Sequence, residues 1–428
     1  MKKILAVIAF ALVAVCLVTP KFIAPKFQDQ VTTLVNKINK TPGYIADIES
    51  TESSWFGSTY VISFGFDLGM YEPTLQNENI EVELVLDAQY GPLLFSSQGV
   101  IGLYEAKLKI AGDKQRHILT WDDAQPLYQL SAVGEFDGAI KIEDTIPAFS
   151  NTEKNLTFSG YNGAGKITSD SFSYEGLLAL VNVDDSYQPV KAENIALSME
   201  MEAGLETILK GGFYNSTSDF SIDSLTIGTD ITASNLSMLI EMILDEETQL
   251  GTLKMGYLAE EFNYNEYKVS DLTFMTELDK FSNLFFMDFA SFNERLVEQN
   301  LTSADFIMEQ FVFLQDNLDE LLSHQPEFNI TDFSASFPEG SFKANLTSKL
   351  ADIETPTLEE MLVPEFWLYY TLAKINIEAD DALINNLAER FLANQMRTTI
   401  DSPDVKQQAQ IIINCFAQQG FLFQGGVR

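Results

Sequence analysis

One glycine-rich segment has the residue types and spacing of a possible phosphate-binding site. Gly160-Tyr-Asn-Gly-Ala-Gly-Lys166 matches the start of a phosphate-binding loop. In that motif Ser or Thr follows the lysine and meets magnesium, whereas Ile167 stands here instead. The residues that follow alternate like a strand, while phosphate binding needs a helix N-terminus at this point. We therefore interpret the segment as a glycine turn between strands.

Histidine chemistry would have to use His117 or His324, the two histidines of the chain. His117 lies in a polar turn, and His324 lies just past a predicted helix end, where a cation suits the helix dipole. Either could belong to a Ser-His-Asp site by count alone, but neither has a nucleophile motif beside it. We predict no catalytic residue, and we expect that the protein is not an enzyme.

The sequence contains no clear pattern for a metal-binding or cofactor-binding site. Two cysteines in 428 residues exclude a disulfide-rich scaffold and a four-cysteine zinc site within one chain. Asp184-Asp185 lacks the spaced ligands and the glycine of a calcium loop, so we interpret it as solvated acidic surface. Cys415 lies on an apolar helix face and is predicted to be a buried small hydrophobe. We predict no metal-binding and no cofactor-binding residue.

The composition narrows the class of protein further. Acidic residues outnumber basic ones 62 to 26, which gives a formal net charge of −36. Nucleic acid is therefore not expected as a partner, because binding phosphate needs clusters of Lys and Arg. A hydrophobic fraction of 46% is enough to build cores and rules out wholesale disorder.

The N-terminus has the layout of a membrane segment. Lys2 and Lys3 precede an uncharged apolar run from Ile4 to Val18. At 1.5 Å per residue this run is shorter than a bilayer core of about 30 Å, but the long stem of Lys21 extends its reach. We predict that residues 1–25 form an uncleaved signal-anchor in the lipid bilayer. The same layout places the body in the periplasm, beyond the inner membrane of a Gram-negative cell.

Two other interpretations of this segment remain open. A cleaved signal peptide is the first, although nothing resembling Ala-x-Ala follows the run. A lipoprotein attached through Cys16 is the second, although Val15 is bulkier than the usual residue there. The charge distribution favours the anchor, because residues 1–42 are basic and the rest is strongly acidic.

A juxtamembrane amphipathic helix is predicted over residues 26–42. Its apolar stripe follows helical spacing and consists of Phe27, Val31, Leu34, Val35 and Ile38. The stripe suits either a helix that packs on the body or an interfacial or dimerising helix.

The body after Pro42-Gly43 changes to a period of two, which indicates antiparallel strands with one wet face. The alternation is clear at 60–68, 80–86 and 104–110. From residue 190 a short pattern recurs, in which the apolar phase slips by one at a short polar residue. A bulge at that residue would keep the apolar side chains on one face and bend the strand. The five copies place these residues at Asn194, Ser224, Asn235, Asp271 and Asp332.

The predicted fold class is therefore α+β, with a large, coiled and bulged antiparallel β-sheet and late amphipathic helices. We assign 43–285 to an antiparallel β-rich body and 286–428 to a mixed helix and strand part. Predicted helices follow Thr302, Thr355-Pro356 and Asp380-Asp381, and a last one ends at Gly420. Alternation predicts strands over 367–378 and at the closing segment 421–426.

Together these pieces resemble the YdgA family of Gram-negative envelope proteins, a family of largely unknown function. The likeness rests on the N-terminal anchor, the helix from Phe27 to Ile38 and Glu52-Ser-Ser-Trp55-Phe56-Gly57-Ser58, which enters the first long strand. The end at Gln418-Gln-Gly-Phe-Leu-Phe423 is also similar. For Trp55 and Phe56 themselves we expect a core aromatic pair beside a turn. The resemblance supplies no catalytic residue.

The sequence thus predicts a non-enzymatic, membrane-anchored periplasmic protein. Its bulged strands are similar to those of AsmA-like lipid-transfer proteins, which implies lipid handling in an apolar groove. A bulged sheet that only carries a core is the simpler alternative. A periplasmic scaffold or assembly partner that acts through its amphipathic helices is the second functional hypothesis. Expected partners are lipid acyl chains or envelope proteins, and a homo-oligomer is compatible with both hypotheses.

Overall fold

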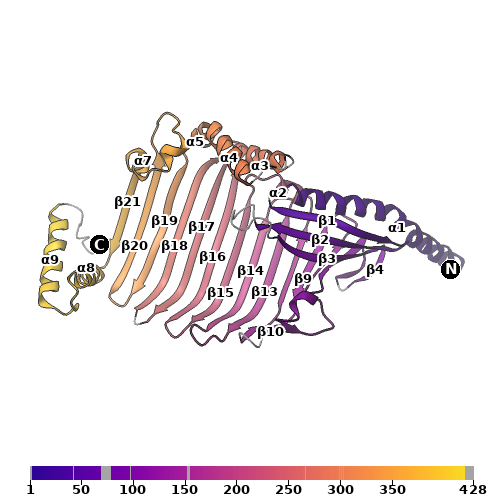
Figure 1. Cartoon of the computed structure of the whole chain (residues 1–428), viewed down its shortest axis with the longest axis horizontal. Coiled ribbons are helices and arrows are strands. Elements are labelled where there is room, and N and C mark those ends of the chain that lie inside the picture. Colours follow the sequence, from indigo (N-terminus) through magenta and orange to yellow (C-terminus); the bar gives the residue numbers. More distant parts are fainter. Residues whose placement is uncertain are drawn as a thin grey trace.

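The computed structural model describes residues 2–41, 43–68, 79–96, 98–151, 155–265, 267–297, 299, 301 and 303–419. Within these ranges the side chains of 2–15, 79, 80, 95, 209 and 303 are not described. The described chain forms a 19-stranded sheet, a separate two-stranded hairpin and a set of helices (Figure 1). The predicted α+β class and the large antiparallel sheet are confirmed.

The strands follow each other along the chain and pair almost entirely with their neighbours in sequence. The main ladder runs in the order β1, β2, β3, β6, β8, β9, and then from β12 through to β21, and all of its pairs are antiparallel. The strands are β1 Tyr44–Ser53, β2 Gly57–Asp67, β3 Asn79–Tyr90, β4 Leu93–Ser96, β5 Gly99–Ile101, β6 Tyr104–Ile110, β7 Thr120–Trp121, β8 Tyr128–Gly134, β9 Ile140–Ile146, β10 Phe149–Asn151, β11 Leu156–Phe158, β12 Tyr161–Ile167, β13 Phe172–Val183, β14 Val190–Met201, β15 Ser216–Ile227, β16 Ile231–Asp245, β17 Leu250–Tyr264, β18 Tyr267–Ser282, β19 Glu327–Phe337, β20 Gly340–Leu350 and β21 Thr371–Ala379.

The helices lie at the ends and margins of the sheet. In Figure 1, α3, α4, α5 and α7 lie along the upper ends of the long strands, and α8 and α9 lie beyond β21. The helices are α1 Lys2–Ile38, α2 Leu205–Leu209, α3 Asn283–Val297, α4 Ser303–Asp316, α5 Leu318–Leu322, α6 Leu358–Met361, α7 Pro364–Tyr370, α8 Asp381–Met396 and α9 Pro403–Gln418.

At the positions of the predicted bulges the sheet has a row of kinks without an inserted residue, because the pairing of β14 with β15 and of β15 with β16 keeps the same register on both sides. Asn194, Asn235 and Asp271 have φ values of 52°, 48° and 51°, in the left-handed region that Asn and Asp tolerate better than most residues. Regular pairing skips Asn194 and Asp223 between β14 and β15, and Asp223 and Asn235 between β15 and β16. The kink at the second copy is therefore one residue earlier than the predicted Ser224.

The fifth copy of the pattern is also irregular. The register between β19 and β20 shifts between Ile330 and Phe333, which brackets the predicted Asp332. Because each kink shifts the phase by one residue, the apolar side chains on both sides of the row point to the same face.

Four predictions about helices and turns need correction. The helix predicted over 26–42 is part of one longer helix, α1, which contains Pro20 and Pro25. A strand was predicted over 367–378, but the residues from Trp367 to Tyr370 lie in helix α7, and strand β21 begins at Thr371. Thr357, and not Thr355-Pro356, caps α6 in a capping box with Glu360. The continuous helix predicted after Thr302 is divided at Asn317 into α4 and α5.

Further corrections concern single side chains. Trp55 and Phe56 are exposed at the turn between β1 and β2, and they are not a core pair. The indole Nε1 of Trp55 donates a hydrogen bond to the carbonyl of Leu17 at 2.8 Å, which ties this turn to α1. Cys415 is exposed on α9, so the prediction of a buried hydrophobe is wrong.

In the part of the chain open to description, none of the helices combines the length and apolar character needed to cross a bilayer. The backbone of residues 2–25, where the anchor was predicted, is part of helix α1, but the side chains of residues 2–15 are not described. The closing strand predicted over 421–426 and the helix end at Gly420 lie outside the described residues.

Candidate functional site on the apolar face of the sheet

A continuous row of apolar side chains crosses the long strands from β14 to β21. We call it the apolar row, and we call the sheet face that carries it the apolar face. Each member pairs directly with the next on the neighbouring strand. The row consists of Leu197, Phe220, Met238, Tyr257, Phe274, Phe333, Ala344 and Ile377. With strands about 4.8 Å apart, the row is roughly 34 Å long.

The neighbouring row on the same face is also mainly apolar. It contains Met199, Ile240, Met255, Ile330 and Ile375, with Ser218 and Thr276 among them. The opposite face is charged and wet, and it carries ion pairs such as Lys254–Glu241 at 3.2 Å and Lys343–Asp332 at 2.9 Å. The sheet therefore separates an apolar face from a hydrophilic one, as the period of two predicts.

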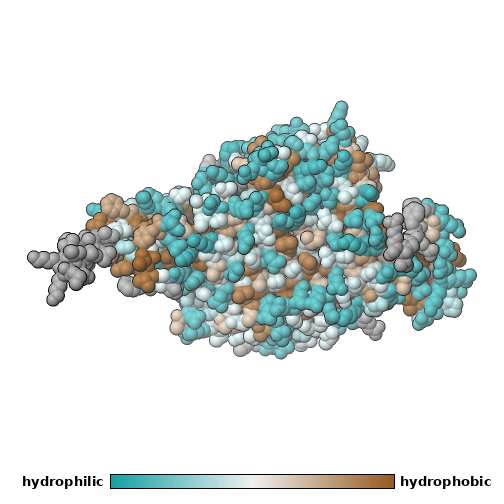
Figure 2. All heavy atoms as spheres, turned by 180° about the vertical axis from the view of Figure 1, so that it is seen from behind, coloured by the Kyte–Doolittle hydropathy of each residue, from teal (hydrophilic) through white to brown (hydrophobic). Residues whose placement is uncertain are grey.

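The apolar row stays partly accessible to solvent. Tyr257 is 47% exposed in the middle of the sheet, and Ile377 is 67% exposed on the last strand. Aromatic rings line its centre, where Phe274 lies 5.4 Å from Phe333 and Phe333 lies 4.9 Å from Phe342 between ring centroids. Figure 2 shows exposed hydrophobic residues across the middle of the molecule, with hydrophilic residues above and below them. A large exposed apolar surface of this kind marks an interaction site.

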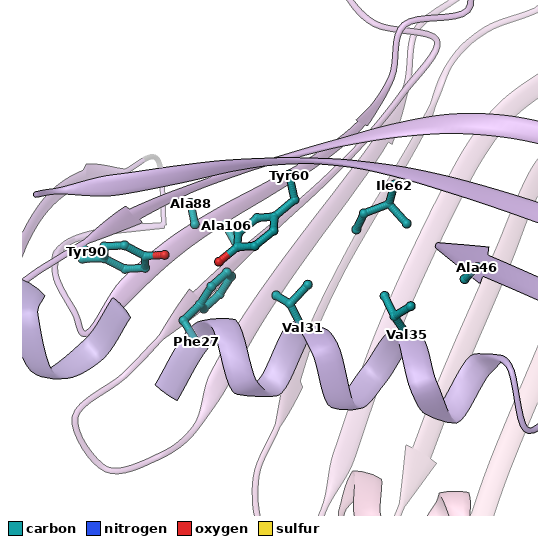
Figure 3. Packing of buried hydrophobic residues seen from close by; sticks show 9 residues of the cluster. All are labelled: Phe27, Val31, Val35, Ala46, Tyr60, Ile62, Ala88, Tyr90 and Ala106. Atoms are coloured by element: carbon teal, nitrogen blue, oxygen red, sulfur yellow. The ribbon is translucent and has the colours of Figure 1, made fainter. Parts of the chain in front are cut away.

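One end of the same face is covered by helix α1. Phe27, Val31 and Val35 are buried against Tyr60 and Ile62 of β2 (Figure 3). The ring of Phe27 lies 5.0 Å from that of Tyr104 on β6 in an edge-on contact. The apolar stripe predicted for this helix thus packs on the body, except for Leu34, which is exposed.

A polar cluster interrupts the apolar face between the covered strands and the open ones. Asp144 on β9 accepts hydrogen bonds from Tyr174 Oη at 2.8 Å and from Tyr128 Oη at 3.4 Å. Tyr161 and Tyr174 are joined by a hydrogen bond between their hydroxyl groups. Asp144 is only 8% exposed, so its carboxylate needs these partners to offset the loss of water.

Glycines make the space for this cluster. A Cβ atom at Gly163 would lie 2.1 Å from Tyr174 Oη and 2.2 Å from Asp144 Oδ1, and one at Gly176 would lie 2.0 Å from Tyr161 Oη. The glycine-rich segment from Gly160 to Lys166 is therefore mostly strand β12, and its prediction as a turn is wrong. The segment is followed by strand β13 and not by a helix, so it lacks the helix N-terminus that a phosphate-binding loop needs. A strand after the glycines was predicted from the sequence.

The environment favours the protonated phenols of Tyr128 and Tyr174. Burial raises the pKa of Tyr128 to about 12, and the nearby Asp144 carboxylate adds to the effect. Burial, together with the hydrogen bonds to Tyr161 and Asp144, also raises the pKa of Tyr174. The cluster thus places phenol hydroxyl groups and the carboxyl group of Asp144 beside the apolar face, where they can hold a polar group.

A second, polar cavity of ≈ 480 Å³ lies near the ends of β2, β3 and β6. Lys109 Nζ lies 2.9 Å from Asp87 Oδ2, and Lys107 Nζ lies 3.0 Å from Glu105 Oε1. Burial works against the ionised form of Asp87, but hydrogen bonds from Lys109 and Thr59 outweigh it and lower the pKa of this carboxyl. Both lysines of the cavity are already paired with carboxylates, so it is a weaker candidate than the apolar face.

The residues singled out from the sequence lie apart from both places. His117 is exposed, with Nδ1 2.6 Å from the carbonyl of Lys114, and His324 is exposed just after α5. Asp184 and Asp185 are exposed in the turn after β13. Among the residues that the structure describes, no group of His, Cys, Asp or Glu is arranged to hold a metal ion.

Sequence reasoning missed the cluster around Asp144, although a signal was present. Tyr128, Tyr161 and Tyr174 each lie on a strand, but the pairing that brings them together involves β8, β9, β12 and β13. The glycines opposite them were the visible clue, because glycine in a strand often marks a close approach of another group.

Comparison with known proteins assigns this architecture to a family. Residues 1–425 match the family described as bacterial protein of unknown function, DUF945. The chain belongs to the DUF945 family. Because the match covers nearly the whole length, helix α1, the sheet and the late helices are all parts of the DUF945 unit. No curated protein and no solved structure matches the chain.

Proposed function

We propose that this DUF945 protein is a non-enzymatic lipid-handling protein that holds acyl chains along the apolar face. The observation that supports it is the apolar row of β14 to β21, which is partly exposed where a globular sheet would be covered. Its length of roughly 34 Å is comparable to the hydrocarbon core of a bilayer, about 30 Å. The resemblance to AsmA-like lipid-transfer proteins that the sequence pattern of these strands suggests points in the same direction.

The free energy gained by burying an acyl chain on this face is large enough for binding. Each methylene taken out of water contributes about 0.8 kcal/mol, so a chain of about twelve methylenes that is half covered gains roughly 5 kcal/mol before the cost of association. An open face suits such a ligand, because an acyl chain needs apolar contact and no directional hydrogen bonds. The cluster around Asp144 lies at one end of the open strands and could hold a polar headgroup.

The proposed location follows from the N-terminal segment. We place the chain at the inner membrane with the body in the periplasm, because Lys2 and Lys3 precede the apolar run from Ile4 to Val18. In this arrangement α1 leads from the bilayer onto the same face that carries the apolar row. Fractionation of cells followed by alkaline extraction checks the placement, since an anchored chain stays with the membrane pellet.

The test of lipid binding uses two adjacent residues on β17. Tyr257 belongs to the apolar face, and Leu258, which is 37% exposed, belongs to the opposite face. We expect Tyr257→Asp to lower co-purified lipid at least fivefold, because a carboxylate in the middle of the row repels acyl chains. Leu258→Asp carries the same charge and is the matched control, with lipid content within twofold of the unchanged chain. Native mass spectrometry of the full chain measures the bound lipid.

Two results would speak against the proposal. One is the absence of lipid from the unchanged chain after gentle extraction, and the other is an equal loss of lipid in both variants. Circular dichroism of both variants separates loss of binding from loss of fold.

A scaffold role is the second candidate, and helix α7 favours it. Leu368 and Tyr369 are exposed side by side on this short helix, and Trp367 is exposed beside them. A photo-reactive residue at Leu368 that captures one defined envelope protein, with no lipid found on the apolar face, would support the scaffold over the lipid carrier.

A further inference from the structure

The last strand of the sheet has an open edge. β21 pairs with β20 on one side, and the described chain places no strand on its other side. Its central side chains are exposed, including Ile375 at 65%. Helix α8 contacts β20, and its Arg390 lies over the ring of Tyr267 on β18. Although α8 and α9 lie beyond β21 in Figure 1, the side chains from Leu372 to Glu378 remain exposed. Such an edge is a template for another strand.

The backbone groups that face this edge can be identified. The amide of Asp380 donates to the carbonyl of Ser341 at 3.0 Å, and the amide of Ala351 donates to the carbonyl of Tyr370 at 2.8 Å. Even-numbered residues of β21 therefore bond to β20, and the odd-numbered residues direct their N–H and C=O groups to the open side. Those residues are Thr371, Ala373, Ile375, Ile377 and Ala379.

The side chains of β21 are complementary to themselves. Lys374 and Glu378 lie at equal distances along the strand on either side of Asn376. In an antiparallel pair of two identical strands centred on Asn376, each Lys374 stands opposite the partner's Glu378. Each Ile375 then stands opposite the partner's Ile377, and the outward backbone groups meet in about eight main-chain hydrogen bonds. We propose that a second copy of this chain pairs antiparallel along β21 about this centre.

Neighbouring registers lack this match. Moving the centre to Ile375 places Lys374 opposite Asn376, and moving it to Ile377 places Asn376 opposite Glu378. Centres at Lys374 or Glu378 put like charges opposite each other, which is unfavourable. The other edge of the ladder, β1, carries the exposed acids Asp47, Glu49 and Glu52, which repel a second acidic chain.

The pairing has a consequence for the apolar face. The Ile375 and Ile377 side chains lie on that face, so two copies joined at β21 continue their apolar rows across the contact. The ion pairs form on the opposite, wet face. The contact is isologous and closes after two copies. This inference concerns the edge alone and stands whether or not the apolar face binds lipid.

The first test uses a disulfide at the two-fold centre. Two Asn376 residues would meet as a pair without mutual main-chain hydrogen bonds, with Cα atoms about 4.5 Å apart, which a disulfide can span. In full-length chains with Cys16 and Cys415 changed to Ser, we expect Asn376→Cys to form a covalent dimer upon mild oxidation in cells. Asn345→Cys is the matched control, because Asn345 pairs with Asn376 inside the sheet and cannot reach a second copy.

The second test changes the charge at the edge. Lys374→Glu places carboxylates opposite each other twice, and we expect it to lower the dimer yield of the Asn376→Cys chain at least tenfold. Lys349→Glu makes the same change in net charge on β20 and is expected to leave the yield within twofold. Equal dimer yields for the cysteines at 376 and 345, or equal effects of the two charge changes, would overturn the proposal. Ladders of higher oligomers would overturn it too, because they indicate an open contact.

Discussion

Gly163 illustrates how one missing side chain makes room for a polar cluster. We predict that Gly163→Ala destabilises the fold by about 1–3 kcal/mol, because the added Cβ would overlap Tyr174 Oη and Asp144 Oδ1 and displace both. Urea unfolding followed by tyrosine fluorescence measures the change. Gly99→Ala is the matched control, since a Cβ there meets nothing closer than 4.0 Å, and it should stay within about 0.5 kcal/mol. Equal effects of the two changes would contradict this account.

For single residues, the sequence predicted backbone features better than side-chain environments. Asn194, Asn235 and Asp271 lie at the predicted kinks, because a slip in apolar phase has few structural solutions. The partners of Asp144 could not be predicted, since they come from four strands whose register depends on distant pairing. The exposure of Trp55 and Cys415 was mispredicted for a related reason: apolar character alone does not tell which face of an element is covered.

Helix α1 offers a prediction at the scale of the element. Val31 is 8% exposed against the sheet, while Leu34 on the same helix is 49% exposed. We expect Val31→Asp to cost about 2–4 kcal/mol, because it buries an unpaired carboxylate between α1 and β2. Leu34→Asp should change stability by less than about 1 kcal/mol. Hydrogen exchange of the full chain is expected to show lost protection in α1 and β1–β3 for the first variant only.

Secondary-structure predictions succeeded for long alternating strands and failed for helix α7. Long strands with strict alternation, such as β2 and β6, were predicted correctly because burial on one face imposes the period of two. Residues from Trp367 to Tyr370 are all large and apolar or aromatic, so their pattern suits either a strand or a helix. Pro364 stands at the first position of α7, and this local signal favours a helix over a strand for these residues.

At the scale of the whole molecule, the net charge of −36 decides how stability responds to salt. The folded sheet holds its carboxylates closer together than the unfolded chain does, so mutual repulsion opposes folding. The ion pairs in the described residues are mostly exposed, and such pairs contribute little each. Repulsion should therefore outweigh attraction, and screening the charges should favour the folded state.

We accordingly predict that the free energy of unfolding rises when NaCl increases from 10 to 200 mM, because the screening length falls from about 30 Å to below 10 Å. Thermal unfolding at fixed pH measures the midpoint at each concentration, and KCl at the same ionic strength should give the same shift. A fall in the midpoint would mean that the ion pairs on the wet face, such as Lys343–Asp332, dominate over repulsion. The same screening should favour pairing of two acidic chains at β21, since their overall repulsion weakens more than the close contacts between Lys374 and the partner's Glu378.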